Sequence, residues 1–294
     1  MSLPGRPGEP GSSAAPTAAA PFPVVVNLRS IGVSFAWWRE QALRLEEAGY
    51  AGVAAWDHFV SRGRRSDPVL EAWTTLAAIG GASSRLGLLT FVANVMNRHP
   101  AVLARMAATL QEATGGRLVL GIGIGGHPGE HRAYGIPFPD APERVARLEE
   151  AVAVLRALWT GGPVTRPSPF YPLVEAHAFP IPDPPPPIVV GAQTPAGAGL
   201  AARIGDGWTT PAPLLAGLLP AYLAALAAAG RERAAQRILV AFDLAKGATL
   251  ESSPWVEDPA GEADRWRAAG ADGAVLGAGS TADVDLLVEA ADRR

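Results

Sequence analysis

The stretch from Gly115 to Pro139, GGRLVLGIGIGGHPGEHRAYGIPFP, holds residues well suited to a binding site. A short apolar strand is expected at 118–122, and it runs into four glycines, which are Gly121, Gly123, Gly125 and Gly126. A strand that ends in residues without side chains leaves its backbone open to close approach by a ligand. The polar, aromatic and Pro-broken segment 127–139 has the make-up of a functional loop. We therefore expect this strand end to form one wall of a site for a flat cofactor.

Other expected strands also end in residues that could face a ligand. These are Asn27 and Arg29, Asp57 and His58, Phe91 to Asn94, Gly191 to Thr194, Trp208 and Thr209, and finally Asp243 and Gly277. The set contains no pair of close carboxylates, no Ser-His-Asp order and no His/Asp cluster at metal-ligand spacing. A site so rich in glycine and aromatic residues, and so poor in acids, suits a reaction whose difficult step belongs to a bound cofactor.

The composition excludes several classes of protein. The 294 residues carry a net charge of −3 without a long block of like charge, so nothing indicates nucleic acid or an anionic membrane as a partner. Cys is absent, which excludes disulfides and thiolate chemistry. No apolar run reaches the ~18 residues that a membrane span requires. Residues 1–22 are expected to form a disordered tail, because this low-complexity leader lacks the apolar centre of a secretory signal. We expect a cytoplasmic protein.

From residue 23 onward, strand and helix patterns alternate. Compact apolar runs predict strands, and apolar residues at helical spacing between capping and stop residues predict helices. The expected strands are 23–28, 51–55, 86–93, 118–122, 188–190, 205–209, 237–243 and 273–276. The expected helices are 35–48, 68–82, one beginning at Pro100, 141–159, 195–204, 214–229, 260–269 and 283–290.

Residues 161–187 break this alternation. The segment contains too much Pro for a helix or a central strand, so we interpret it as an insertion of extended pieces packed over the mouth of the fold. Eight strand–helix units with short apolar strands imply a parallel sheet that is buried on both faces. The predicted fold is α/β, a single (β/α)8 TIM barrel over 23–294 with an insertion after the fourth helix. The alternative is a doubly wound open sheet with fewer units.

Several motifs in this order resemble the bacterial luciferase-like family. They are Trp56-Asp57-His58-Phe59, Asn97-Arg98-His99-Pro100, the GGRLVLGIGIGG strand with Glu130 and Tyr134 to Phe138, and Gly205-Asp206-Gly207-Trp208. The family comprises flavin-dependent monooxygenases and coenzyme F420-dependent oxidoreductases. The resemblance covers roughly residues 23 to 290, and it implies a (β/α)8 barrel, a flat ring across the strand ends and a homodimer.

The resemblance also implies roles for individual residues at the second and third strand ends. His58 and Asp57 are the predicted catalytic residues. His58 matches a histidine that handles a proton beside the reactive ring, and Asp57 would orient the ring or cap a turn. Many members have a non-prolyl cis peptide after the third strand, which here would be Phe91–Val92; an ordinary trans bond is the alternative. Asn94 would donate to a ring oxygen or serve as a turn residue.

The fourth and fifth strand ends complete the implied site. Gly123, Gly125 and Gly126 would let the ring or the substrate approach the backbone. Gly126 departs from the sugar-phosphate dehydrogenases of the family, which carry a glutamate there, and this puts sugar-phosphate oxidation in doubt. Exposed N–H groups of Gly191, Ala192, Gln193 and Thr194 would hold the cofactor phosphate at a helix N-terminus, unless this segment is merely a cap. Glu130 and Tyr134 are expected to hold the loop, and Trp208 to border the pocket.

The predicted activity is transfer of a hydride between coenzyme F420 and a small organic substrate. His58 would supply the proton handling that a deazaflavin does not. The first alternative is an FMN-dependent monooxygenase, which would need a dry pocket to protect a peroxyflavin from water. The second alternative is a cofactor-binding barrel without catalysis, which the missing acid at Gly126 favours. No metal is expected in the site.

Overall fold

A parallel sheet closed into a barrel organises the computed structural model, which describes residues 22–61, 63–242 and 249–294. Its strands lie in the order β3-β2-β1-β11-β10-β9-β8-β5, and the pairing of β3 with β5 closes the ring. The barrel strands are β1 (Val24–Leu28), β2 (Gly52–Ala55), β3 (Gly87–Thr90), β5 (Leu118–Gly123), β8 (Ile188–Gly191), β9 (Gly207–Pro211), β10 (Arg237–Phe242) and β11 (Gly273–Ala278). The predicted (β/α)8 barrel is therefore confirmed.

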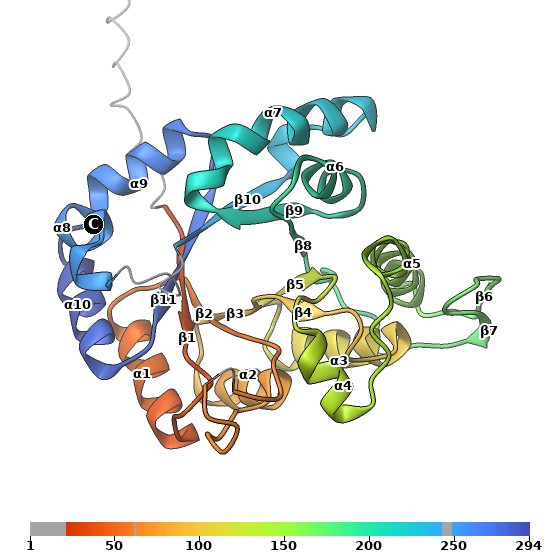
Figure 1. Cartoon of the computed structure of the whole chain (residues 1–294), viewed down its shortest axis with the longest axis horizontal. Coiled ribbons are helices and arrows are strands. Elements are labelled where there is room, and N and C mark those ends of the chain that lie inside the picture. Colours follow the sequence, from red (N-terminus) through yellow and green to blue (C-terminus); the bar gives the residue numbers. More distant parts are fainter. Residues whose placement is uncertain (1–21, 62, 243–248) are drawn as a thin grey trace, which may run out of the picture.

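Helices surround the barrel, and at least one lies between each barrel strand and the next in the chain (Figure 1). They are α1 (Phe35–Glu47), α2 (Ala72–Ala82), α3 (Pro100–Ala113), α5 (Ala141–Leu158), α6 (Pro195–Ile204), α7 (Ala212–Ala228), α8 (Pro254–Glu257), α9 (Pro259–Ala268) and α10 (Thr281–Ala291). Short 3-10 turns lie at Arg233–Ala235 and Leu250–Ser252. Within the described residues, no helix combines the length and the apolar character needed to span a bilayer.

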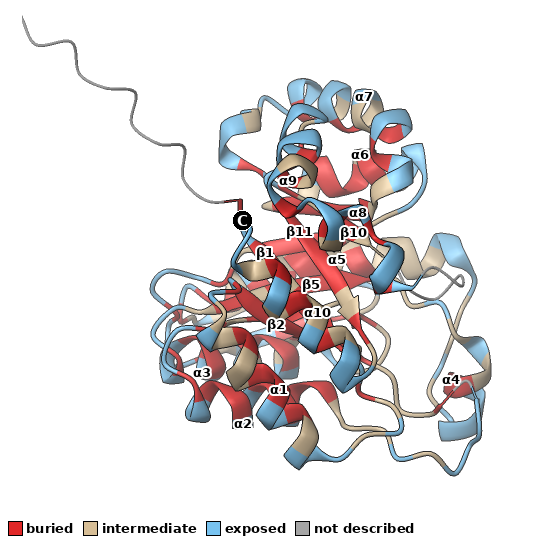
Figure 2. Cartoon of the chain, turned by 90° about the vertical axis from the view of Figure 1, so that its left-hand side faces the viewer, coloured by how far each residue is buried: buried red, intermediate tan, exposed pale blue. Residues whose placement is uncertain are grey.

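The apolar core has two parts. The larger lies between the strands and the helices, and the strands are buried on both faces while the helices expose their outer faces (Figure 2). The smaller fills the barrel and joins inward-facing side chains of different strands. Its members are Ala54, Leu89 and Val275, with Val25, Phe91, Val119 and Leu239 packed against them. This inner layer supports whatever binds above it, at the carboxyl ends of the strands.

Two elements depart from the regular alternation at that end. The strand expected at 86–93 is interrupted, so that β3 stops at Thr90 and a short β4 (Ala93–Asn94) pairs with β5. The segment expected as a loop, 127–139, contains the helix α4 (Pro128–Tyr134). In Figure 2, α4 stands apart from the ring of helices. It begins with Pro at its first position and ends at Gly135, whose φ of 65° suits glycine.

The Pro-rich insertion lies outside the barrel. Its strands β6 (Val164–Arg166) and β7 (Leu173–Ala176) form an antiparallel hairpin, which extends past α5 at the outer edge of the molecule (Figure 1). Its final part returns to the start of β8, where the Leu120 N–H donates to the Pro187 carbonyl oxygen over 2.9 Å. Our interpretation that the insertion covers the mouth was wrong, because the hairpin lies beyond α5 at the outer edge of the molecule and the final part leads to the amino end of β8.

Two expected features lie outside the described residues. These are the tail, of which residues 1–21 are not described, and Asp243, which was expected at the end of the strand now seen as β10.

Candidate active site at the strand ends

The four neighbouring strands β2, β3, β5 and β8 bring the predicted site residues to one side of the barrel mouth. The register pairs Ala55 with Thr90 and Ile122 with Val190, so their carboxyl ends lie level. The segments that follow therefore meet at the same edge, and these are 57–58, 91–94, 123–127 and 191–194.

Val92 forms the centre of this edge. The Phe91–Val92 peptide is cis, as the resemblance implied. A Cβ placed on Gly123 would lie 3.0 Å from Val92 Cγ2, and one on Gly191 would lie 3.3 Å from both Val92 methyl carbons. The glycines at these two strand ends thus make room for the Val92 side chain, so part of the predicted bare wall is covered by Val92 itself.

The next two glycines differ from each other. A Cβ on Gly125 would lie 2.5 Å from Asn94 Oδ1, and its φ of 74° favours glycine in any case. A Cβ on Gly126 would meet no atom within 4 Å. Gly126 is therefore the glycine of this segment that borders open space, and a larger side chain would fit there.

The Asn94 side chain forms hydrogen bonds with other residues of the protein. Its Nδ2 lies 3.1 Å from Asn97 Oδ1 and 2.7 Å from His131 Nε2, while its Oδ1 accepts from the Met96 N–H over 3.0 Å. Both amide hydrogens are therefore directed at protein acceptors. The structure supports a loop-holding role for this side chain in place of the predicted donation to a ring oxygen.

His131 completes that support from α4. Its side chain is buried, and its ring lies 4.4 Å from the Phe138 ring between centroids. Burial lowers the pKa of His131 below its usual 6.5, against the attraction of Glu130, and Arg144, His127 and His58 lower it further. A neutral imidazole can accept the Asn94 hydrogen at Nε2, so α4 and the 94–97 turn depend on an uncharged His131.

We expect the stability that depends on His131 to be lost in acid. Because its pKa is lowered in the folded state, the unfolded chain binds the proton first, and stability falls as pH drops below about 6.5. The His131→Gln variant keeps a hydrogen-bond acceptor without this titration. Urea unfolding at pH 7.5 and 5.5 should show a larger loss for the wild type than for His131→Gln. The exposed His177→Gln is the matched control, and an equal loss in all three proteins would contradict the assignment.

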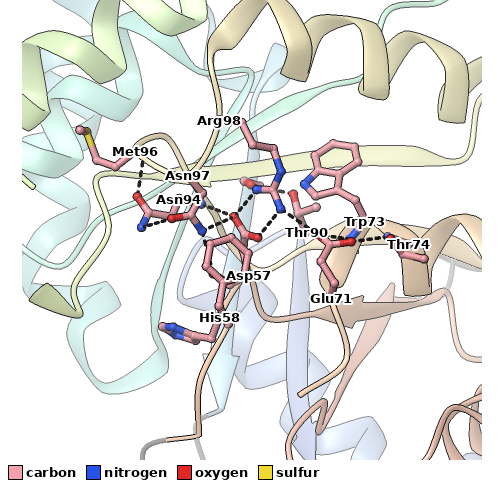
Figure 3. A network of polar contacts seen from close by, with 12 residues as sticks. Asp57, His58, Glu71, Trp73, Thr74, Thr90, Asn94, Met96, Asn97 and Arg98 are labelled. Atoms are coloured by element: carbon pink, nitrogen blue, oxygen red, sulfur yellow. Dashed lines mark hydrogen bonds and ion pairs between the residues drawn. The ribbon is translucent and has the colours of Figure 1, made fainter. Parts of the chain in front are cut away.

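Asp57 lies in a buried ion-pair network (Figure 3). Its side chain is 1% exposed, and its two oxygens accept from Arg98 Nη1 and Nη2 over 2.7 and 2.9 Å. Oδ2 also accepts from the Asn94 N–H and from Asn97 Nδ2. Arg98 continues to Glu71 Oε1 over 2.7 Å. Burial lowers the pKa of Arg98, but the two carboxylates outweigh it and raise the pKa overall. These contacts support a positioning role for Asp57 in place of the predicted catalytic one.

His58 points away from that network (Figure 3) and towards α4. Its Nδ1 lies 2.8 Å from Glu130 Oε2, and the carboxylate is only 4% exposed while the imidazole is 26% exposed. Glu130 Oε1 also accepts from the Phe59 N–H. A carboxylate on Nδ1 fixes the orientation of the ring and keeps the proton on that nitrogen, so a neutral His58 has its lone pair on Nε2. This is the geometry of an oriented general base.

Glu130 was expected only to hold the loop, and its pairing with His58 was missed. The two residues are 72 positions apart, and α4 brings them together. Tyr134 does hold the loop as expected, since its hydroxyl donates to the Phe59 carbonyl oxygen over 3.3 Å and the two rings meet edge to face.

The segment from Gly191 to Thr194 begins α6. Thr194 caps the helix by accepting from the Gly197 N–H over 3.1 Å, and Gln193 and Thr194 are exposed. The Ala192 N–H donates to the Thr209 carbonyl oxygen, and Trp208 Nε1 donates to the Ala192 carbonyl oxygen. Trp208 is buried and stacks on Tyr222, so the expectation that it borders the pocket was wrong. The helix-cap alternative is thus present, and phosphate binding at this exposed N-terminus stays a prediction.

The strand-end surface fits a flat cofactor with an anionic chain. Phe91, Val92, Gly191 and Ala192 are all partly exposed, and any side chain at Gly191 would press on the Val92 methyl groups. They form a mainly apolar surface for a ring, with the positive end of the α6 dipole at its edge for a phosphate.

Comparison with known proteins identifies a family and several relatives. The sequence model of the luciferase-like monooxygenases matches residues 13–252. An F420-dependent glucose-6-phosphate dehydrogenase of Kribbella flavida is 37% identical over 170 residues, which are 58% of this chain and 51% of that protein. An F420-dependent hydroxymycolic acid dehydrogenase of Mycobacterium tuberculosis is 36% identical over 190 residues, which are 64% of this chain and 52% of that protein. The chain spans about half the length of these curated relatives.

Among solved structures, the fold is similar to that of an F420-dependent secondary alcohol dehydrogenase in complex with an F420-acetone adduct. The TM-score is 0.80 at 23% identity, and the match covers 93% of this chain and 98% of that one. At this identity the likeness shows the fold.

Proposed function

The chain belongs to the luciferase-like monooxygenase family, and we propose that it is an oxidoreductase that transfers a hydride between coenzyme F420 and a small organic substrate. The observation that carries this proposal is the pair of a buried Glu130 carboxylate and a partly exposed His58 imidazole beside the Val92 surface. The names of the relatives, which are F420-dependent dehydrogenases, support the choice of cofactor.

The residues of this chain would divide the work as follows. Val92 and the backbone of Gly191 and Ala192 would support the ring, and the α6 N-terminus would face the anionic chain. When bound, the deazaflavin supplies hydride exchange at the central carbon of its ring system. Glu130 holds the His58 ring by Nδ1, and Nε2 would take the proton from the substrate oxygen or return it. The Asp57–Arg98 ion pair fixes the backbone from which His58 projects.

Titration of the purified protein with coenzyme F420 and with FMN, followed by fluorescence, tests this proposal. We expect micromolar binding of F420 and none of FMN. The reverse result would favour the monooxygenase alternative, and failure to bind either ligand would contradict both. Val92→Ala should weaken F420 binding, because it removes methyl groups from the surface that supports the ring.

We also propose that the enzyme is a homodimer and acts in the cytoplasm. The dimer is an expectation from the family and can be tested by sedimentation of the purified chain, where a monomer at micromolar concentration would contradict it.

A further inference from the structure

We propose that His127 is a second catalytic imidazole, which binds the substrate oxygen together with His58. The inference rests on the proposed function and adds to it the first residue of the segment 127–139, which was expected as a functional loop. It predicts that the substrate carries the oxidised or reduced carbon as an alcohol or a carbonyl group.

His127 shares the carboxylate that orients His58. Its Nδ1 lies 3.5 Å from Glu130 Oε2, the same oxygen that lies 2.8 Å from His58 Nδ1. The two rings stand nearly perpendicular, at 86°, with centroids 6.1 Å apart. One buried carboxylate oxygen therefore lies beside Nδ1 of both imidazoles, and it forms a hydrogen bond with His58.

The exposed part of the His127 side chain does not include Nδ1, the nitrogen that faces Glu130. Its Nδ1 is buried and has no hydrogen-bond partner among the described residues, yet its side chain is 30% exposed. The accessible surface therefore belongs to the rest of the ring. Gly126, which precedes it, leaves open space where another residue would place a side chain. A substrate group can thus reach this side of His127.

Two imidazoles at this separation can contact one substrate oxygen. Hydrogen bonds of ~2.8 Å from two nitrogens to one oxygen bridge a distance of up to ~5.6 Å, which rings with centroids 6.1 Å apart allow. The Glu130 carboxylate holds the proton of His58 at Nδ1, so its Nε2 is an acceptor. Nδ1 of His127 makes no hydrogen bond among the described residues, so His127 can carry its proton at Nε2 and donate it to the same oxygen. A hydroxyl or carbonyl oxygen requires both an acceptor and a donor, because it gains or loses a proton as the C–O bond order changes.

The balance of the step follows from this arrangement. Oxidation of an alcohol removes a hydride from carbon, for which the proposed oxidised cofactor is the acceptor, and a proton from oxygen. The proton passes to Nε2 of His58, and the N–H of His127 stabilises the carbonyl oxygen as it forms. In reduction the same groups act in reverse, and the protonated imidazole gives its proton to the new hydroxyl group.

The first test uses the apo protein and does not depend on turnover. The chain has five histidines, so the ring nitrogens of the ¹⁵N-labelled protein can be assigned from single substitutions. Glu130→Gln should shift the signals of both His58 and His127 and leave those of His177 unchanged. Addition of cyclohexanone should also shift both. A change confined to His58, or no change with the ketone, would overturn the proposal.

The second test compares His127→Ala, His127→Asn and His177→Ala in the oxidation of a panel of simple alcohols by F420. We expect ~100-fold lower kcat/KM for His127→Ala, partial recovery for His127→Asn and recovery of His127→Ala by added imidazole. F420 affinity should stay within several-fold of wild type. An active wild type whose His127→Ala variant is equally active would overturn the inference and leave the proposed function intact. A wild type that binds no F420 contradicts the proposed function, and the apo measurement still decides the inference.

Discussion

Replacement of Asp57 by Ala is expected to lower the free energy of unfolding by about 3–5 kcal/mol. The reason is the guanidinium of Arg98, which is 13% exposed and makes two of its three short ionic contacts with Asp57. Without that carboxylate, the partly exposed Glu71 is the remaining ion-pair partner of Arg98 among the described residues. Burial of the Arg98 charge is then poorly compensated. The Asn94 N–H and the Asn97 amide lose an acceptor as well.

Two variants control this result in urea unfolding. Asp285→Ala removes one partner of the surface pair with Arg44, whose side chains are 32% and 50% exposed, and should cost less than about 1 kcal/mol. Asp57→Ala combined with Arg98→Met should recover part of the loss, because it removes the charge that was left unpaired. If Asp57→Ala were no more costly than Asp285→Ala, the network would not support the mouth of the barrel.

The barrel could be predicted because its signals are local. The cap residues of α1 and α6 directly precede these helices in the sequence, and Ser34 and Thr194 accept from the Trp37 and Gly197 N–H groups. The start of α2 was predicted four residues early, at 68, because the Glu71 side chain caps the helix by accepting from Trp73 and Thr74 N–H. Glutamate is a less common N-cap than Ser or Asp, so the sequence did not indicate that the helix begins after Glu71.

The glycines of the strand ends show why the site was harder to predict. A glycine in a sequence does not say whether a neighbouring atom excludes a side chain there, or which neighbour does so. At Gly123 and Gly191 that neighbour is Val92, at Gly125 it is Asn94, and at Gly126 there is none. The sequence pattern was the same in each case, whereas the spatial reason differed. Only the fold distinguishes a covered glycine from an open one.

The pairing of His58 with Glu130 could not be predicted for a related reason. Both residues were noted, but in separate motifs, and only the helix α4 brings them together. That helix lies in a segment expected as a loop, because the seven residues from Pro128 to Tyr134 are too few for a clear helical pattern. Because the helix was too short to be predicted, the position of the Glu130 carboxylate beside His58 could not be predicted either.

Replacement of His58 by Ala is expected to lower kcat by ~10²–10⁴-fold while F420 affinity stays within several-fold of wild type. The imidazole would act on the substrate proton, whereas Val92 and Gly191 would form the surface for the ring. Steady-state kinetics with F420 and fluorescence titration of the same samples measure the two quantities separately. Equal turnover of His58→Ala and wild type would show that the proton is handled elsewhere.

Glu130→Gln should reproduce part of this loss, and the double variant should be no worse than His58→Ala alone. The amide keeps the shape of the carboxylate, but it can turn its NH2 group towards Nδ1 of His58 and reverse the tautomer of the ring. Its effect therefore passes through the histidine, and two residues that act as a unit do not have additive effects. Additive losses would mean that Glu130 acts on its own, for example only by holding the Phe59 backbone. The kinetic cycle thus separates a carboxylate that orients the base from one that merely closes the loop.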